Sequence, residues 1–131
     1  MATDPIDYYR DITFWNSFDV VQRYQNRLAT GNPATFWYDH LLRDHGSFKR
    51  ALILNCGNGW VERHLVGIGL VREAVGIDIS SASIAEAQRL AAEAGAAITY
   101  QELDINSAAL PAGPFDLVIN HAAAHHITRI D

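Results

Sequence analysis

The sequence of 131 residues has little cysteine, little positive charge and no long apolar run. Its single cysteine, Cys56, cannot form an internal disulfide, so nothing demands an oxidising compartment. Ten Lys and Arg residues against 15 Asp and Glu leave a formal net charge of −5, which argues against binding to a nucleic-acid backbone. No apolar run approaches the roughly 18 to 20 residues that span a bilayer. Residues 1–7 lack the positive start of a secretion signal. We therefore expect a cytoplasmic protein without a nucleic-acid or membrane partner.

The composition is that of a globular protein, with 49% apolar and 19% charged residues. Most aromatic residues precede residue 49, whereas small and aliphatic residues dominate the rest of the chain. This shift predicts a helical lead-in over residues 1–48 and a region of alternating strands and helices over residues 49–131.

The lead-in has the start and stop signals of two helices. The first is predicted over about residues 17–29, ends at Gly31 and buries three side chains, Val21, Tyr24 and Leu28. The second is capped by Asn32, has Pro33 in its first turn and ends at Gly46. Three aromatic residues near the N-terminus are candidates for a lid over a bound ligand: Tyr8, Tyr9 and Trp15.

After residue 49, short apolar runs alternate with helical segments. The predicted strands are residues 51–54, 74–78, 98–103 and 115–119. The predicted helices are residues 60–68 and 80–94, with a third that begins at residue 121. Strands that alternate with helices pair in parallel through right-handed crossovers, so the predicted fold class is α/β, with a layered sheet.

The strongest functional signal lies where the predicted strands end. The first strand runs into a turn rich in Gly and Asn, residues 55–59, where backbone N–H groups can approach a ligand closely. Asp78 ends the second strand, where a carboxylate accepts hydrogen bonds from both hydroxyls of a ribose. Asp104 ends the third strand, within reach of an adenine amino group. Each aspartate alone is equally explained as the cap of a following turn, but together with the turn they favour nucleoside binding.

Glu62 bears on which nucleoside is bound. A dinucleotide-binding turn has a third glycine three residues beyond Gly59, where this chain has Glu62, and a carboxylate repels a nearby pyrophosphate. A ligand with a neutral or cationic tail, such as the amino acid end of S-adenosylmethionine, suits an acidic site better. An NAD-dependent oxidoreductase is the alternative interpretation.

Four segments resemble, in order, the motifs of the class I S-adenosylmethionine-dependent methyltransferases, which have a Rossmann-like fold. The segments are residues 51–59 (ALILNCGNG), 75–80 (VGIDIS), 103–105 (LDI) and 115–120 (FDLVIN), with AHHI following at 124–127. The resemblance covers about residues 50–127 and implies parallel strands in the order 3-2-1-4. It also implies S-adenosylmethionine as the cofactor and methylation of a small molecule as the activity.

The same resemblance implies a role for each matching residue. It implies that the methionine part of the cofactor is bound by Asn55, Cys56, Gly57, Asn58 and Gly59. The ribose would be bound by Asp78 and Ile79, the adenine by Asp104 and Ile105, and the sulfonium end would lie over Asn120. The family commonly has an acid at position 53 and glycine at position 55, where this chain has Ile53 and Asn55. Asn tolerates positive φ, so the turn can survive. Without the acid the chain holds the cofactor less well unless Glu62 compensates.

Three histidines follow the last predicted strand. Methyl transfer requires alignment of nucleophile, carbon and sulfur, and a base only if the acceptor arrives protonated. His121 and His125 are the candidate bases, and their spacing of four would place them on one helical face, where they also suit a metal ion. No third ligand supports a metal, so none is expected. Packing is the commoner role for such histidines, including His126.

The family's sheet has seven strands, of which this sequence supplies four. We therefore interpret the chain as the N-terminal part of a longer methyltransferase, with the cofactor-binding strand ends present and much of the acceptor wall absent. The strand at residues 115–119 is too apolar for a solvated edge, which predicts self-association through it. A non-catalytic, cofactor-binding half-domain is the alternative to an active enzyme.

Overall fold

The computed structural model describes residues 17–128, which fall into two compact units divided between Gly46 and Ser47. The candidate lid residues Tyr8, Tyr9 and Trp15 lie outside the described residues. No helix within the described range is both long and apolar enough to cross a membrane.

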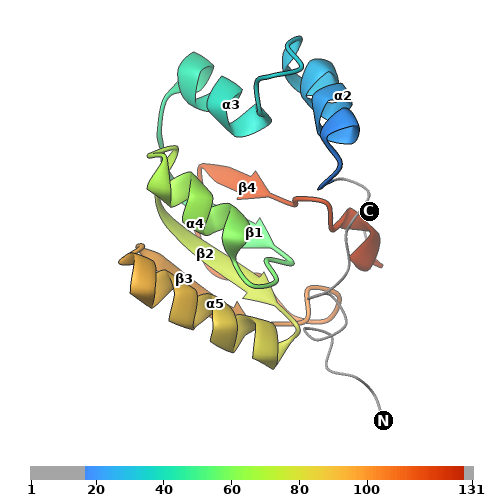
Figure 1. The fold of residues 1–131 in the computed structure, drawn as a ribbon. Helices are drawn as coiled ribbons and strands as arrows, with labels where there is room; N and C mark the ends of the chain where they lie inside the picture. Colours follow the sequence, from blue (N-terminus) through green and yellow to red (C-terminus); the bar gives the residue numbers. More distant parts are fainter. Residues whose placement is uncertain (1–16, 129–131) are drawn as a thin grey trace. The chain divides into compact units, whose positions relative to one another are not determined.

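The first unit contains two helices, α2 (Asp19–Thr30) and α3 (Trp37–His45) (Figure 1). As predicted, α2 stops at Gly31 and α3 at Gly46, each with positive φ. The predicted start of α3 at Asn32 is wrong. The Asn32 side chain instead accepts a hydrogen bond from the Ala34 N–H at 2.8 Å. This local turn keeps the backbone out of the helix until residue 37.

The buried side of α2 differs from the prediction. Tyr24 and Leu28 are 55% and 68% exposed rather than buried, and Asn26 is the buried residue of the helix. The Asn26 side-chain amide donates to the Pro33 carbonyl at 3.2 Å. A polar contact to the following turn, which helical periodicity does not reveal, therefore decides which side of α2 is covered.

The second unit is built on a parallel sheet in the order β3-β2-β1-β4, as the family resemblance implied. Its strands are β1 (Phe48–Leu54), β2 (Val71–Asp78), β3 (Ile98–Glu102) and β4 (Leu117–Ile119). β1 and β2 both start three residues earlier than predicted, because a strand extends as far as its backbone is paired rather than as far as its apolar run. Phe48, for example, is in register with Val71.

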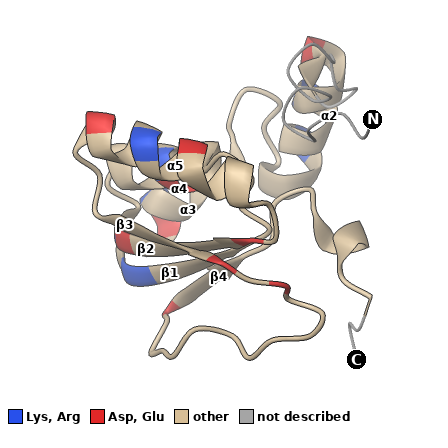
Figure 2. Cartoon of the chain, turned by 90° about the horizontal axis from the view of Figure 1, so that it is seen from below, with Lys and Arg blue, Asp and Glu red and all other residues tan. Residues whose placement is uncertain are grey.

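Helices α4 (Trp60–Gly67) and α5 (Ser81–Ala94) lie on the same side of the sheet (Figures 1 and 2). The Ser80 hydroxyl caps α5 by accepting from the Ser83 N–H at 3.2 Å. The helix buries an apolar face against the sheet, made of Ile84, Ala87 and Ala91. Its solvent side carries Arg89, which pairs with Glu86 and Glu93. Two alanines therefore lie in the contact between α5 and the sheet, while the charged side chains of α5 lie on its solvent side.

The opposite side of the sheet is covered by loop residues. A cluster of Leu52, Val75 and Ile77 from β1 and β2 forms this part of the core. The partly buried residues that pack on it are Leu54, Leu103, Ile105 and Phe115. The chain between β3 and β4 therefore acts as the second layer on this side among the described residues.

The burial pattern predicts unequal costs for the same substitution on neighbouring strands. Val75 is 3% exposed, whereas Val118 on β4 is 57% exposed. Val75→Ala should lower the free energy of unfolding by about 2 kcal/mol, since it removes buried methyl groups and leaves a cavity. Val118→Ala, the matched control, should change it by less than about 0.5 kcal/mol. Urea denaturation measures both, and equal losses would contradict the assignment of the core.

Candidate functional site

The turn between β1 and α4 is held in a left-handed conformation at three positions. Asn55, Gly57 and Gly59 have φ values of 53°, 56° and 76°. Asn55 thus adopts the positive φ that was expected of it. The Cys56 N–H donates to the Ile77 carbonyl at 2.9 Å, which joins the turn to the end of β2. The turn is therefore fixed against the sheet before α4 begins.

Asp78 ties the same turn to the end of β2. Its Oδ2 accepts a hydrogen bond from the Gly57 N–H at 2.9 Å, and its Oδ1 accepts from the Ser80 N–H at 2.9 Å. A carboxylate has about four lone-pair sites, so these two bonds leave each oxygen able to accept another. The half-buried Asp78 can therefore hold the backbone and receive two further donors.

Asp104 caps the turn after β3. Its Oδ1 accepts from the Asn106 N–H and its Oδ2 from the Ser107 hydroxyl, both at 2.9 Å. These hydrogen bonds hold the pKa of the Asp104 carboxyl below its usual range. Asp104 thus has the capping role that was the alternative to ligand binding, with one lone pair on each oxygen still unused.

Two isoleucines flank these aspartates in different surroundings. Ile79 is 64% exposed next to Asp78, whereas Ile105 packs partly buried on the cluster of Leu52, Val75 and Ile77. An exposed isoleucine beside a half-buried carboxylate provides an apolar surface next to a polar group. That combination suits a ligand with a flat apolar part attached to a hydroxylated sugar.

Asn120 follows β4, the strand that pairs with β1. Its Oδ1 is buried and has no hydrogen-bond partner among the described residues. The Asn55 side chain donates to the Ala123 carbonyl at 3.5 Å, which links the two chain segments that leave β1 and β4. Buried polar atoms are normally hydrogen-bonded, so the orphaned Asn120 oxygen marks a place where a bound molecule can donate.

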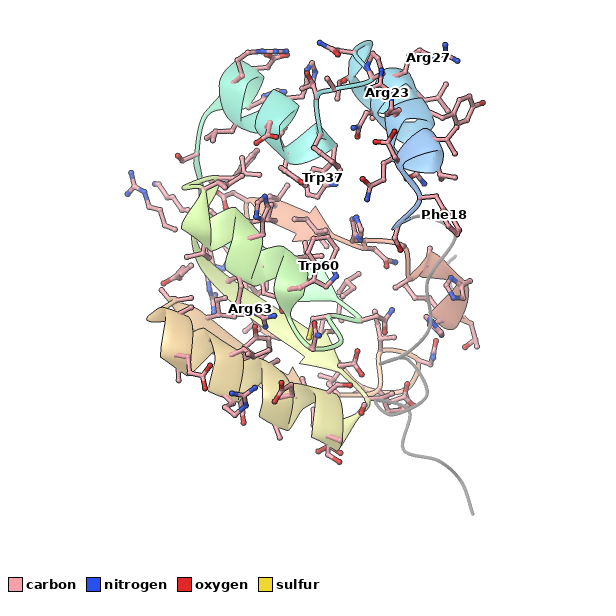
Figure 3. All side chains as sticks on the ribbon, viewed as in Figure 1. Phe18, Arg23, Arg27, Trp37, Trp60 and Arg63 are labelled. Carbon is pink, nitrogen blue, oxygen red and sulfur yellow. The ribbon has the colours of Figure 1, made fainter. Side chains whose placement is uncertain are left out.

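Trp60 and His121 form an aromatic pair between the same two segments. Their ring centroids are 5.2 Å apart and the rings are perpendicular. Trp60 begins α4, directly after the glycine turn, and is 49% exposed (Figure 3). Burial lowers the pKa of His121, which favours its neutral form. Trp60 was not predicted as a site residue, although its position directly after Gly59 places it at the end of the glycine turn.

The prediction that His121 and His125 share a helical face is wrong. Only Ala124–His126 forms a short 3-10 helix, and it does not include His121. His125 is exposed and its ring lies 4.0 Å from that of His126, centroid to centroid. The two candidate bases therefore have different surroundings, and the shared helical face that would have suited a metal ion does not form.

Glu62 lies behind the glycine turn, fully buried at 0% exposure. Burial raises its pKa to about 7, because desolvation penalises the charged carboxylate. The Tyr100 hydroxyl is close enough to oppose part of this shift, yet neither carboxylate oxygen makes a hydrogen bond of good geometry. Burial and the charges of Glu62 and Asp78 also raise the pKa of Cys56.

Comparison with known proteins assigns a family to this fold and site. A family model described as a methyltransferase domain matches residues 51–131. The ubiquinone biosynthesis O-methyltransferase of Nitrosococcus oceani is 32% identical over 99 residues, which cover 73% of this chain and 40% of that protein. The chain thus spans less than half the length of this relative.

Solved structures agree with the family. An S-adenosylmethionine-dependent methyltransferase from Mesorhizobium loti is 31% identical, with a TM-score of 0.51 over 64% of this chain and 38% of that one. A methyltransferase from Thiobacillus denitrificans, solved with S-adenosyl-L-homocysteine, shares the fold at 20% identity, with a TM-score of 0.53 over 61% of this chain and 32% of that one.

The fold is that of a Rossmann-like methyltransferase sheet. The chain belongs to the class I S-adenosylmethionine-dependent methyltransferases, whose cofactor is S-adenosylmethionine. This result decides against the NAD-dependent oxidoreductase.

The burial of Glu62 predicts how stability depends on pH. The folded pKa of about 7 lies above the ordinary value of 4.5, so the fold favours the protonated acid. The stabilisation is complete below about pH 4.5 and is lost as pH rises through 7. Relative to Glu62→Gln, the wild-type protein should lose about 2 to 3 kcal/mol of unfolding free energy between pH 5 and pH 8.

Urea denaturation at the two pH values measures this loss. The exposed Glu102 provides the matched control, and Glu102→Gln should keep the pH dependence of the wild-type protein. A wild-type curve parallel to that of Glu62→Gln would contradict a proton on Glu62.

Proposed function

We propose that this chain is the cofactor-binding part of an S-adenosylmethionine-dependent methyltransferase that acts on a small molecule. The observation that carries the proposal is Asp78, whose carboxylate ties the glycine turn to β2 and keeps lone pairs for two further donors. The name of the O-methyltransferase relative supports a small-molecule acceptor. The single buried cysteine is consistent with a cytoplasmic protein.

Each candidate residue has a part in holding the cofactor. In this proposal the methionine portion binds along the turn formed by Asn55, Cys56, Gly57, Asn58 and Gly59. Asp78 accepts hydrogen bonds from the ribose hydroxyls, with Ile79 alongside. Asp104 and Ile105 hold the adenine, and Asn120 lies under the sulfonium end. The residues fit such a ligand because they combine unused acceptors, an exposed apolar side chain and a backbone turn.

Bound S-adenosylmethionine supplies a methyl group already activated by its sulfonium. The protein then has to orient the acceptor and exclude water. His121 is the proposed base for an acceptor that arrives protonated, because burial lowers its pKa and a neutral imidazole can accept a proton. The perpendicular contact with Trp60 holds the His121 ring at the end of β4. The exposed His125 has no comparable support and is not assigned a role.

Substitution of Asp78 tests the cofactor site. Asp78→Asn should weaken binding of S-adenosylhomocysteine by about 10- to 100-fold, because charge-assisted hydrogen bonds are lost. Asp116 is a matched control, since its carboxylate accepts from the Lys49 and Arg50 N–H groups at 2.8 Å, at the opposite end of β1. Asp116→Asn should bind like the wild-type protein, and calorimetry measures both. Equal losses of affinity in the two variants would contradict the assignment of Asp78 to the cofactor site.

A turnover assay separates an enzyme from a non-catalytic half-domain. We expect S-adenosylhomocysteine to bind in calorimetry. Transfer of a labelled methyl group from S-adenosylmethionine to phenolic and other small acceptors then identifies an active enzyme. Binding without transfer to any acceptor favours the half-domain.

Self-association through β4 is a second part of the proposal. β4 is at the edge of the sheet and is paired only with β1 in the described part of the chain, and its Val118 is exposed. Unpaired strand edges with apolar side chains add further strands. Analytical ultracentrifugation should show a concentration-dependent dimer that Val118→Lys abolishes. A wild-type protein that stays monomeric at all concentrations contradicts this part.

A further inference from the structure

Glu62 is the most unusual side chain of the second unit. It is 0% exposed, and both of its carboxylate oxygens are buried without a hydrogen-bond partner. A buried carboxylate without a well-formed hydrogen bond is strongly destabilising when charged, so its retention needs an explanation. Leu65, one turn along the same helix, shows that the buried side of α4 otherwise takes an apolar residue.

The carboxylate occupies a space that two glycines keep open. A Cβ atom added at Gly59 or at Gly76 would lie 2.9 Å from the Glu62 Oε1 and would also collide with Tyr100. Gly59 belongs to the turn and Gly76 to β2, so Glu62 and Tyr100 lie directly behind the backbone of the proposed cofactor site. The Tyr100 hydroxyl is likewise buried without a hydrogen-bond partner.

The groups that act on Glu62 come from each element around it. They are the Cys56 thiol in the turn, the Tyr100 hydroxyl on β3 and the Arg63 guanidinium on α4 itself. The charge of Asp78, at the end of β2, raises the pKa of the Cys56 thiol, as the charge of Glu62 does. The charged residues of α5 pair with one another on its solvent side. Cys56 and Tyr100 have raised pKa values and stay neutral, so Glu62 is the group here that changes charge near neutral pH.

We propose that Glu62 is a positioning residue that adjusts the charge behind the glycine turn to that of the ligand in front of it. The inference rests on the proposed function. A sulfonium bound along residues 55–59 favours the ionised carboxylate, because opposite charges separated by a low-dielectric backbone layer attract strongly. Binding of the cationic cofactor therefore releases the Glu62 proton. The neutral-sulfur product, S-adenosylhomocysteine, releases less of it, so Glu62 favours substrate cofactor over product.

The test compares the two ligands at two pH values in two proteins. In the wild-type protein, the preference for S-adenosylmethionine over S-adenosylhomocysteine should rise about three- to tenfold from pH 6 to pH 8. In Glu62→Gln the rise should be less than about twofold. Effects that do not involve Glu62 contribute equally to both proteins and cancel. Glu102→Gln, with an exposed carboxylate removed, should behave like the wild-type protein.

Proton release provides an independent measurement. Calorimetry in buffers of different ionisation enthalpy should show that S-adenosylmethionine releases more protons from the wild-type protein than from Glu62→Gln at pH 7. If Glu62→Gln does not fold, carboxyl carbon NMR of the wild-type protein should show one glutamate titrating near pH 7, with its midpoint lowered by S-adenosylmethionine.

The outcomes separate this inference from the proposed function. Equal pH dependence and equal proton release in the wild-type protein and Glu62→Gln, or a glutamate midpoint that the ligand leaves unchanged, overturns the role of Glu62 alone. Absence of binding of both ligands to every folded variant overturns the proposed function and this inference with it.

Discussion

The carboxylate of Asp78 joins the parts of the second unit that the site needs. By accepting from the Gly57 N–H and the Ser80 N–H, it connects the turn after β1 with the chain that leaves β2. Neighbouring parallel strands end at the same edge of a sheet, but nothing in strand pairing fixes the loops beyond that edge. A charge-assisted hydrogen bond to each of two backbone N–H groups does so. The glycine turn and the start of α5 therefore hold their positions relative to one another.

Glu62 places a second carboxylate on the other side of the same turn. Asp78 is half-buried and hydrogen-bonded, whereas Glu62 is fully buried and its carboxylate makes no hydrogen bond of good geometry. The two side chains have the same chemistry but different surroundings, and for Glu62 burial raises the pKa. A chain with isoleucine at position 53, near the C-terminal end of β1, still has an acid close to the turn, and α4 contributes it instead of the strand.

Much of the fold was predictable because short-range rules govern it. The apolar runs located every strand of the sheet, and Gly31, Gly46 and Gly95 end helices in a conformation that glycine adopts readily. The errors have local physical causes. Asn32 forms a turn with Ala34 instead of capping α3, and the segment after β4 forms only a 3-10 turn at residues 124–126. At Asn32 a side-chain hydrogen bond within two residues competes with helix formation. After β4 the Asn106 side chain, about 20 residues earlier in the sequence, donates to the His126 carbonyl and accepts from the Thr128 N–H instead, and periodicity reports neither contact.

By itself the sequence determined the family, the strand order and the residues at the strand ends, because these follow from the order and spacing of motifs along the chain. Only the tertiary structure decided what each of those residues contacts. In that structure Asp104 caps a turn, His121 packs against Trp60, and His125 is exposed. It also decided that Glu62, which the sequence placed near the ligand, lies behind the backbone with Tyr100. Burial is a property of three-dimensional packing, and burial governs the charge of that carboxylate.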